Sequence, residues 1–434
     1  MMGKGAGRMT GRGLRPRRLA HHPRRRLLRG PGYWSRLGPG IVTGAADDDP
    51  SGIGTYSQVG AAFGFGLLWT TLATLPLAIA VQEATARLGL VTGKGLAALL
   101  RERFPRPVLL GAVTLVAVAN TFNIGADIGS MAAAAGLLVP LPQTVAAIAF
   151  ALLMVGLEVA VPYHRYARVL RWLALSLLAY VAVLAVVHVD WAAALAHTVA
   201  PRFHPDRTSL AALLAVFGTT ISPYLFFWQA GEEVEEQADR PEPVNRRHLV
   251  AMRLDVAAGM GSGVGVMFAI MVTAAVTLGA HGAVQVDTAQ QAAQALRPLA
   301  GPLAGLLFAA GIVGTGLLAV PVLAGSTAYA IAETAGWHEG LGRRVSQARA
   351  FYAVIAASIL VGVAMGFVGV SPIRALYLAA ILNGVAAPPL LLLILLLARS
   401  DAVLGEHRSG LVSQLLVGGA AVVMAVLSLL VVLP

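Results

Sequence analysis

Apolar stretches of about twenty residues recur along the chain from Leu37 nearly to Pro434, with only short polar breaks between them. A helix of that length crosses the hydrocarbon core of a bilayer and satisfies its own backbone polar groups. Of the 434 residues, 57% are hydrophobic and only 12% are charged, which is far more apolar than a soluble globular domain. The sequence therefore predicts an all-α polytopic membrane protein.

The basic loops indicate how the chain crosses the membrane. With a cytoplasmic N-terminus, the loops richest in Lys and Arg fall inside, as the positive-inside rule requires, and the C-terminus lies outside. We expect a multi-pass protein of a bacterial inner membrane. Eleven segments are predicted: Leu37–Ala62, Phe65–Leu88, Val108–Leu138, Thr144–Val161, Val169–Val187, Leu210–Gln229, Ala251–Leu278, Leu303–Ala324, Ala350–Val368, Ile373–Leu397 and Leu411–Leu433.

The net charge of +11 originates in residues 1–36, which hold eleven Lys and Arg and no acid. Such an arm can bind nucleic acid or act as a transit peptide, but a disordered cytoplasmic tail near anionic lipid is the simpler explanation. We therefore predict a basic arm over 1–36 and a transmembrane transport domain over 37–434. We expect the transport domain to be surrounded by the lipid bilayer. We expect the protein to have neither a nucleic acid nor an obligate protein partner.

Two segments are interrupted by proline beside polar residues, the first at "GAADDDPSGIGTY" and the sixth at "TTISPY". Proline removes a backbone donor and glycine tolerates non-helical angles, so each break frees carbonyl oxygens. If the first ten segments are two repeats of five, both breaks fall in the first member of a repeat, as in inverted-repeat transporters. For the sixth segment a simple proline kink is the alternative.

Three consecutive aspartates in the first break are costly in a membrane unless a cation balances them. A hard divalent ion binds oxygen from carboxylates, carbonyls, hydroxyls and water. Successive carboxylates cannot all point at one centre, so we expect one to bind directly and the others to shape the entrance. The ion is cargo, and no cofactor is expected. The first break offers Asp47, Asp48, Asp49, Ser51 and the carbonyl of Ala46.

The stretch "GPGIVTGAADDDPSGIGTYSQVGAAFGFGLLW", followed by "QEATARLGLVTG", resembles the NRAMP family of proton-coupled transition-metal transporters. The similarity is close in the first two segments and extends more weakly over nearly all of the membrane domain. The resemblance implies the LeuT-type fold, an inverted repeat of five plus five helices, here with an eleventh transmembrane helix.

The family's two ligand motifs map onto the two breaks. Its Asp-Pro-Gly-Asn motif places the aspartate on Asp49 and the asparagine on Gly52, and "SPYL" replaces its Met-Pro-His-Asn motif. The resemblance therefore implies that Asp49 is the direct ligand. To the residues of the first break it adds Gly52, Thr219, Ser222 and Tyr224.

These departures bear on the cargo. The family's methionine thioether favours softer metals, and Ser222 replaces it with a hydroxyl. A sparse, oxygen-only site suits partly hydrated magnesium, and the chain is similar in this respect to the NRAMP-related magnesium transporter branch. We expect import of Mg²⁺, with Mn²⁺ left open, by alternating access. The alternatives are a proton-coupled Mn²⁺ or Fe²⁺ symporter and a LeuT-type transporter of an organic cation.

This chain also differs from the family along the family's proton pathway. Its acidic pair in the third helix falls on Asn123 and Ala126, and its histidine in the sixth falls on Gln229. None of these titrates, so we expect transport without proton coupling. Asp127 is either a relocated proton or ion site, or a carboxylate paired with a neighbouring helix.

Other polar residues leave further alternatives. Glu83 and Asn383 either line the cavity or serve helix packing, and "GEEVEEQ" (231–237) either attracts leaving cations or is a solvated charge run. Paired intramembrane aspartates can also perform acid–base hydrolysis. That chemistry needs carboxylates converging from different helices, whereas these are sequential, so we expect no enzyme.

Overall fold

A computed structural model describes residues 39–161, 175–201, 205–239, 244–281, 285–366 and 369–433. The predicted arm over 1–36 and the start of the fifth predicted segment lie outside these ranges. Within them the chain forms helices and turns and contains no strand, so the predicted all-α class is confirmed. Seven of the described helices or helix runs are long and apolar enough to cross a membrane.

Most predicted segments coincide with one long helix, because uninterrupted apolar sequence satisfies its backbone only as a helix in lipid. The ends generally agree within a few residues. These helices are α3 (Trp69–Thr92), α5 (Arg106–Ala135), α6 (Gln143–Ala160), α12 (Arg246–Thr277), α15 (Ala304–Ala335), α16 (Arg349–Met365), α17 (Pro372–Ala398) and α19 (Leu411–Val432).

Both predicted breaks are confirmed. The first segment divides into α1 (Pro39–Asp47) and α2 (Pro50–Phe63), and the sixth into α10 (Arg207–Thr220) and α11 (Pro223–Asp239). In each case a proline is the first residue of the second half, where its missing N–H costs nothing. The backbone at Ile221 leaves the helical region, with φ −117° and ψ 62°, so the sixth segment is broken rather than merely kinked.

Two helices run further than predicted: α11 continues past Gln229 to Asp239, and α15 continues past Ala324 to Ala335. In α11 the acidic residues suggested an exit into solvent. However, Glu232 and Glu233 are buried, so a solvated charge run is the wrong description for them. Packing against α3 and α15 keeps this charged sequence helical.

The connections contain short helices that the sequence did not predict. They are α4 (Leu96–Arg103), α9 (Trp191–Val199), α13 (Ala289–Ala293), α14 (Arg297–Ala300) and α18 (Asp401–Leu404), while α8 (Leu178–Val183) belongs to the fifth predicted segment. The 3₁₀ turns are η2 (Leu175–Leu177), η3 (Gly279–His281), η4 (Gln294–Leu296), η5 (Gly301–Leu303), η6 (Val345–Gln347) and η7 (Gly405–His407).

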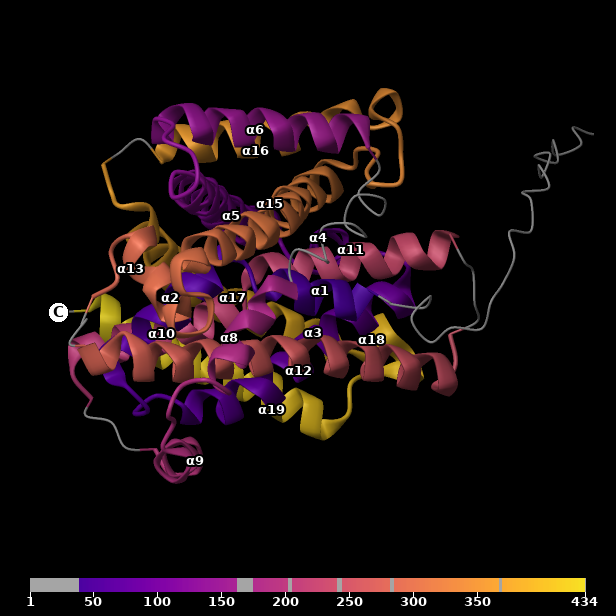
Figure 1. The fold of residues 1–434 in the computed structure, drawn as a ribbon. Coiled ribbons are helices and arrows are strands. Elements are labelled where there is room, and N and C mark those ends of the chain that lie inside the picture. Colours follow the sequence, from indigo (N-terminus) through magenta and orange to yellow (C-terminus); the bar gives the residue numbers. More distant parts are fainter. Residues whose placement is uncertain are drawn as a thin grey trace, which may run out of the picture. The chain divides into compact units, whose positions relative to one another are not determined.

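The long helices pack in two groups. One contains α1, α2, α3, α11 and α12, and the other contains α5, α6, α15 and α16. Between them lies α17, and α10 packs against α17, α19 and α2. In Figure 1, α6 and α16 lie next to each other on one side, while α12 and α19 lie on the opposite side. Both broken segments pack at the junction of the two groups, so their interruptions lie inside the protein.

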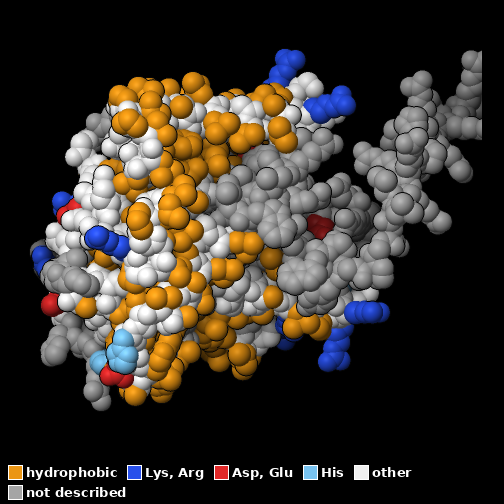
Figure 2. Space-filling view, in the orientation of Figure 1, with side chains coloured by type: hydrophobic (Ala, Val, Ile, Leu, Met, Phe, Trp, Pro, Cys, Tyr) orange, Lys and Arg blue, Asp and Glu red, His pale blue; other side chains and the backbone are white. Residues whose placement is uncertain are grey.

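The outer surface is apolar where a bilayer would contact it. On the face shown in Figure 2, hydrophobic side chains form a broad band, and most of the charged side chains lie toward its edges. Exposed leucines and valines on α6 and α19 contribute to this surface, among them Leu152, Leu415 and Val422. In water such a patch would drive aggregation, whereas lipid solvates it.

Candidate metal site

Asp49 is placed by its role as the N-cap of α2. Its Oδ1 accepts the backbone N–H of Gly52 at 2.8 Å and the hydroxyl of Ser51 at 2.6 Å. Side-chain oxygens at this position satisfy the free N–H groups of the first turn, and the positive end of the helix dipole favours a carboxylate there. The helix start therefore fixes the carboxylate at the break.

The second oxygen of Asp49 faces other helices. Oδ2 lies 3.2 Å from Nδ2 of Asn123 on α5 and 3.3 Å from the hydroxyl of Tyr224 on α11. The same hydroxyl donates to the carbonyl of Ala46 at 2.8 Å, a carbonyl at the end of α1. The buried carboxylate of Asp49 thus connects α2, α5 and α11. The carbonyl oxygen of Ala46, at the end of α1, shares the Tyr224 hydroxyl with it and is a second possible oxygen ligand.

The sixth-segment break contributes hydroxyls. Thr219 Oγ1 lies 3.2 Å from Ser51 Oγ, so the ends of α10 and α2 meet. Ser222 donates its hydroxyl hydrogen to the carbonyls of Gly218 and Thr219, each at 2.8 Å, which leaves only its lone pairs for another partner. Gly52 keeps space open here, since a Cβ at that position would stand 3.5 Å from Thr219 Oγ1.

The other two aspartates are directed elsewhere. Asp47 and Asp48 are both buried, and a Cβ built at Gly263 of α12 would lie 3.4 Å from Asp47 Oδ2 and 3.8 Å from Asp48 Oδ1. Among the described residues, Asp47 Oδ1 has no hydrogen-bond partner. The three carboxylates therefore do not form one cage, and nowhere in the described part of the chain do three His, Cys, Asp or Glu side chains gather for a metal.

Hydrogen bonds attach α1 to the helices that pack against it. The hydroxyl of Thr43 donates to the side-chain carbonyl of Gln229, whose amide donates to Glu233 at 3.0 Å, and the N–H of Gly40 donates to Asp255 at 2.7 Å. These bonds hold α1 against α11 and α12.

Glycines let α1 pack closely against α12. A Cβ at Gly44 would lie 2.3 Å from the backbone of Gly259, which is closer than any side chain tolerates. The α1 half-helix is therefore seated directly on the backbone of α12.

The structure brings most of the predicted site residues together. The residues that surround the first break are Asp49, Ala46, Ser51, Gly52, Thr219 and Tyr224. Ser222 lies at the sixth-segment break, where it bonds to the end of α10, and Asp47 and Asp48 face α12. Asn123 is the functional candidate that the sequence did not place in the site. The sequence shows only an amide at the position where the family carries an aspartate. By itself this residue indicates the loss of a proton carrier, not a place in the site.

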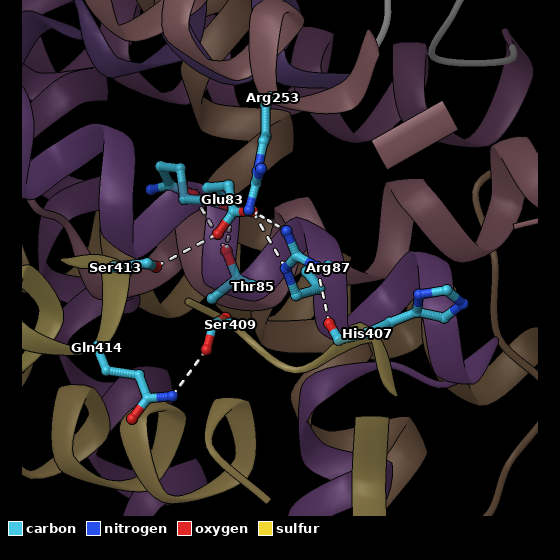
Figure 3. A network of polar contacts seen from close by, with 9 residues as sticks. Glu83, Thr85, Arg87, Arg253, His407, Ser409, Ser413 and Gln414 are labelled. Atoms are coloured by element: carbon cyan, nitrogen blue, oxygen red, sulfur yellow. Dashed lines mark hydrogen bonds and ion pairs between the residues drawn. The ribbon is translucent and has the colours of Figure 1, made fainter. Parts of the chain in front are cut away.

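Glu83 does not line the cavity. Its Oε1 accepts Nε of Arg87 at 3.1 Å and Nε of Arg253 at 2.8 Å, and its Oε2 lies 3.4 Å from the hydroxyl of Ser413 (Figure 3). Arg87 also donates to the carbonyl of His407 at 2.7 Å. This carboxylate is buried but paired, and it connects α3, α12 and α19.

Comparison with known proteins finds relatives that are named as divalent metal transporters. A Burkholderia ambifaria protein named "Divalent metal cation transporter MntH" is 31% identical over 284 residues, covering 65% of this chain and 64% of that protein, which is less than two thirds of its length. The protein of the same name from Acidiphilium cryptum is 26% identical over 396 residues, covering 89% of this chain and 88% of that one.

Solved structures agree on the fold. The Eremococcus coleocola manganese transporter aligns with a TM-score of 0.72 at 18% identity, covering 93% of this chain and 88% of that one. Mhp1, a nucleobase-cation-symport-1 family transporter, aligns with a TM-score of 0.56 at 14% identity, covering 90% and 91%. The predicted LeuT-type fold is therefore confirmed.

The family model described as natural resistance-associated macrophage protein-like matches residues 40–434, nearly the whole chain outside the basic arm. The resemblance first noted around the aspartate triplet thus extends over the complete membrane domain, and the chain belongs to the Nramp family.

Proposed function

We propose that this protein carries divalent metal cations across the membrane by alternating access, with Mn²⁺ as its principal cargo. One observation carries the proposal: Asp49 is fully enclosed at a helix break, with the carbonyl of Ala46 and several hydroxyls close by. A carboxylate at this depth is costly unless it serves an ion. Oxygen donors of these kinds suit manganese, magnesium and calcium.

Membership of the Nramp family supports a metal cargo, and the relatives and solved neighbours whose names mention divalent metals or manganese favour Mn²⁺ over Mg²⁺. Mn²⁺ accepts carboxylate, carbonyl and water ligands, so the lack of a thioether at Ser222 does not exclude it. This revises the expectation of a magnesium transporter of the related branch.

Magnesium remains the second candidate because of Ser222 and Gly52. No sulfur is available at position 222, and the absent side chain at 52 leaves room beside Thr219. Mg²⁺ usually keeps several of its waters and binds through one or two carboxylates. A site with one carboxylate and room for water fits this coordination preference.

We further propose that α1 opens the inner side when it leaves α12. Its contacts with Gln229, Asp255 and Gly259 hold it closed in this conformation. Exposed basic side chains on α4, including Arg101 and Arg103, agree with a cytoplasmic location for that end of the molecule and with a cytoplasmic N-terminus. The division into a basic arm and a transport domain stays a prediction.

Uptake into proteoliposomes tests the cargo. Mn²⁺, Mg²⁺ and Cd²⁺ should be offered separately and in competition, with Asp49→Asn as the matched control because asparagine keeps the N-cap and removes the charge. We expect saturable Mn²⁺ uptake that Asp49→Asn abolishes. Saturable uptake of Mg²⁺ with none of Mn²⁺ would select the second candidate, and absence of any divalent uptake would overturn the proposal.

A further inference from the structure

The side-chain amide of Asn123 has a partner at only one of its two ends. Its Nδ2 lies 3.2 Å from Asp49 Oδ2, whereas its Oδ1 is buried and has no hydrogen-bond partner among the described residues. The side chain has no exposed surface, so bulk water does not reach this oxygen. An amide oxygen carries two lone pairs, and a buried one without a partner is costly. The packing of α5 therefore leaves a neutral oxygen without a partner beside Asp49.

The two oxygens of Asp49 have different surroundings. Oδ1 accepts two short hydrogen bonds, of 2.6 and 2.8 Å, from the first turn of α2. Oδ2 has longer contacts, to Asn123 at 3.2 Å and to the hydroxyl of Tyr224 at 3.3 Å, and that hydroxyl donates its hydrogen to the carbonyl of Ala46. Oδ2 is therefore the oxygen that is left for a cation, and Asn123 lies next to it.

The first break supplies few other ligands on this side. Mn²⁺, Mg²⁺ and Ca²⁺ take about six or more oxygen ligands, which include carboxylates, side-chain and backbone carbonyls and water. Gly52 brings no side chain, and Asp47 and Asp48 face α12 instead. A divalent cation at Oδ2 of Asp49 thus has a coordination position open to a neutral oxygen from α5.

The present orientation of the amide suits an empty site. An N–H group that points at a carboxylate stabilises its charge. The same N–H group would repel a cation bound to Oδ2 of Asp49. Rotation about the last side-chain bond of asparagine exchanges its oxygen and nitrogen, and this torsion is broad. The amide of Asn123 can therefore present either end to the break.

We propose that Asn123 is a ligand of the transported cation: when a divalent ion binds to Asp49, the amide rotates and its Oδ1 coordinates the ion. The rotation breaks only the contact with Asp49, because Oδ1 has no bond to lose. The released N–H groups can donate to Asp127, which is four residues further along the same face of α5 and whose oxygens have no hydrogen-bond partner within the described ranges. This inference rests on the proposed function, because it needs a cation at Asp49.

Asn120, one turn earlier on α5, is a buried amide with a different neighbour. Its Nδ2 lies 3.0 Å from Thr327 Oγ1 and 3.2 Å from the carbonyl oxygen of Leu323, both on α15. Its Oδ1 also has no partner among the described residues. Rotation of this amide would break both contacts, so Asn120 holds two helices together. Asn120 and Asn123 share residue type, helix and burial, and Asn120 is therefore the matched control.

The direct test is a magnetic coupling between the bound ion and the amide. Mn²⁺ is bound to the purified full-length protein, in which asparagine carries ¹³C at the side-chain amide carbon, and electron–nuclear double resonance detects ¹³C attached to a ligand atom. The chain has four asparagines: Asn120, Asn123, Asn245 and Asn383. We expect a ¹³C coupling in wild type and in Asn120→Ala, and none in Asn123→Ala.

Calorimetric titration of Mn²⁺ measures the effect on affinity. Asn123→Ala should weaken binding by about 10- to 100-fold, a range that is lost even with groups that only support metal ligands. An amide that served only to stabilise the empty carboxylate would compete with the cation, so its removal would leave the affinity unchanged or raise it. Asn120→Ala should lower the unfolding temperature, while the folded protein binds Mn²⁺ as tightly as wild type.

Wild type alone decides the matter if a variant fails to fold. Binding of Mn²⁺ by wild type without any ¹³C coupling would overturn the inference and leave the proposed function intact. A coupling that persists in Asn123→Ala, or an undiminished affinity of that variant, would also overturn the inference. Failure of wild type to bind Mn²⁺ would instead overturn the proposed function.

Discussion

The carboxylates at the first break and the carboxylate of Glu83 are equally buried, yet their surroundings differ. Glu83 is flanked by Arg87 and Arg253 and accepts a further hydroxyl, so its charge is neutralised within the protein. Among the described residues, Asp49 has hydrogen-bond donors but no cationic partner, and Asp127 has neither. Buried acids in a membrane domain therefore fall into two kinds, which are distinguished by their partners rather than by their depth.

This difference separates structure from transport. Paired charges such as Glu83 and Arg253 hold helices together, and removing one partner leaves the other without its counter-charge. Unpaired carboxylates destabilise the empty protein and are retained only where a mobile cation or proton completes them. Variants that remove the charge from a carboxylate of each kind test this division.

The largest effect is expected from Asp49→Asn. The substitution keeps the cap of α2 but removes the charge that faces Asn123 and Tyr224. Transport should fall by more than about 100-fold, since even the loss of residues that only support metal ligands costs about 10- to 100-fold. Uptake of radiolabelled Mn²⁺ measures this loss. The thermal unfolding temperature of Asp49→Asn should not fall below that of wild type.

Glu83→Gln should show the opposite pattern. Two arginines lose their buried counter-charge, so we expect a loss of stability of about 3 kcal/mol while metal binding by the folded protein is retained. Thermal unfolding in detergent and Mn²⁺ binding to the folded fraction give the two quantities. If the variant is as stable as wild type but unable to bind Mn²⁺, then Glu83 belongs with Asp49 and the division fails.

Ser222→Met should change selectivity rather than stability. A thioether beside Asp49 adds a soft ligand, so Cd²⁺ should gain about tenfold against Mg²⁺, equivalent to roughly 1.4 kcal/mol. The double variant with Gly52→Asn should shift further, although its Cβ would stand 3.3 Å from the ring of Tyr56 and must be accommodated. Competition of Cd²⁺ against Mg²⁺ uptake measures the shift, and no change would show that position 222 does not face the ion.

The smallest effect is expected at the exposed pair of Lys94 and Glu102. Lys94 donates a hydrogen bond to the Glu102 carboxylate at 2.7 Å and lowers the pKa of Glu102. The contribution of the pair to stability is therefore present above the ordinary pKa of glutamate and is lost as the pH falls. Solvent screens the pair, and Lys94→Ala should leave the unfolding temperature at neutral pH unchanged within error. A marked fall would mean that exposed pairs matter here as much as the buried Glu83.

The sequence was sufficient to predict the long helices and both breaks, but not the short helices of the connections. Lipid requires continuous helix wherever the chain is apolar, and Pro50 and Pro223 mark the points where the helix ends and starts again. It was insufficient for α11, because the acids after Gln229 suggest solvent and only packing against α15 explains their burial. Local chemistry decides the breaks, and tertiary packing decides how far a helix continues.

The candidate site was predictable in part for the same reason. Asp49 and Ser51 are joined by local capping geometry that the sequence carries. Asn123 comes from a distant segment, and its bond to Asp49 depends on where α5 passes the break. The lack of hydrogen-bond partners for Asp127 within the described ranges is likewise a property of the packed helices, because the sequence left pairing open.

The most direct test of the site is the location of the bound ion. Crystals of the full chain soaked with Mn²⁺ should show an anomalous scattering peak about 2.0–2.6 Å from the carboxylate of Asp49 and the carbonyl oxygen of Ala46. Crystals of Asp49→Asn, soaked in the same way, should show none there. A peak elsewhere, or one that survives unchanged in Asp49→Asn, would contradict the assignment of the break at Asp49 as the cation site.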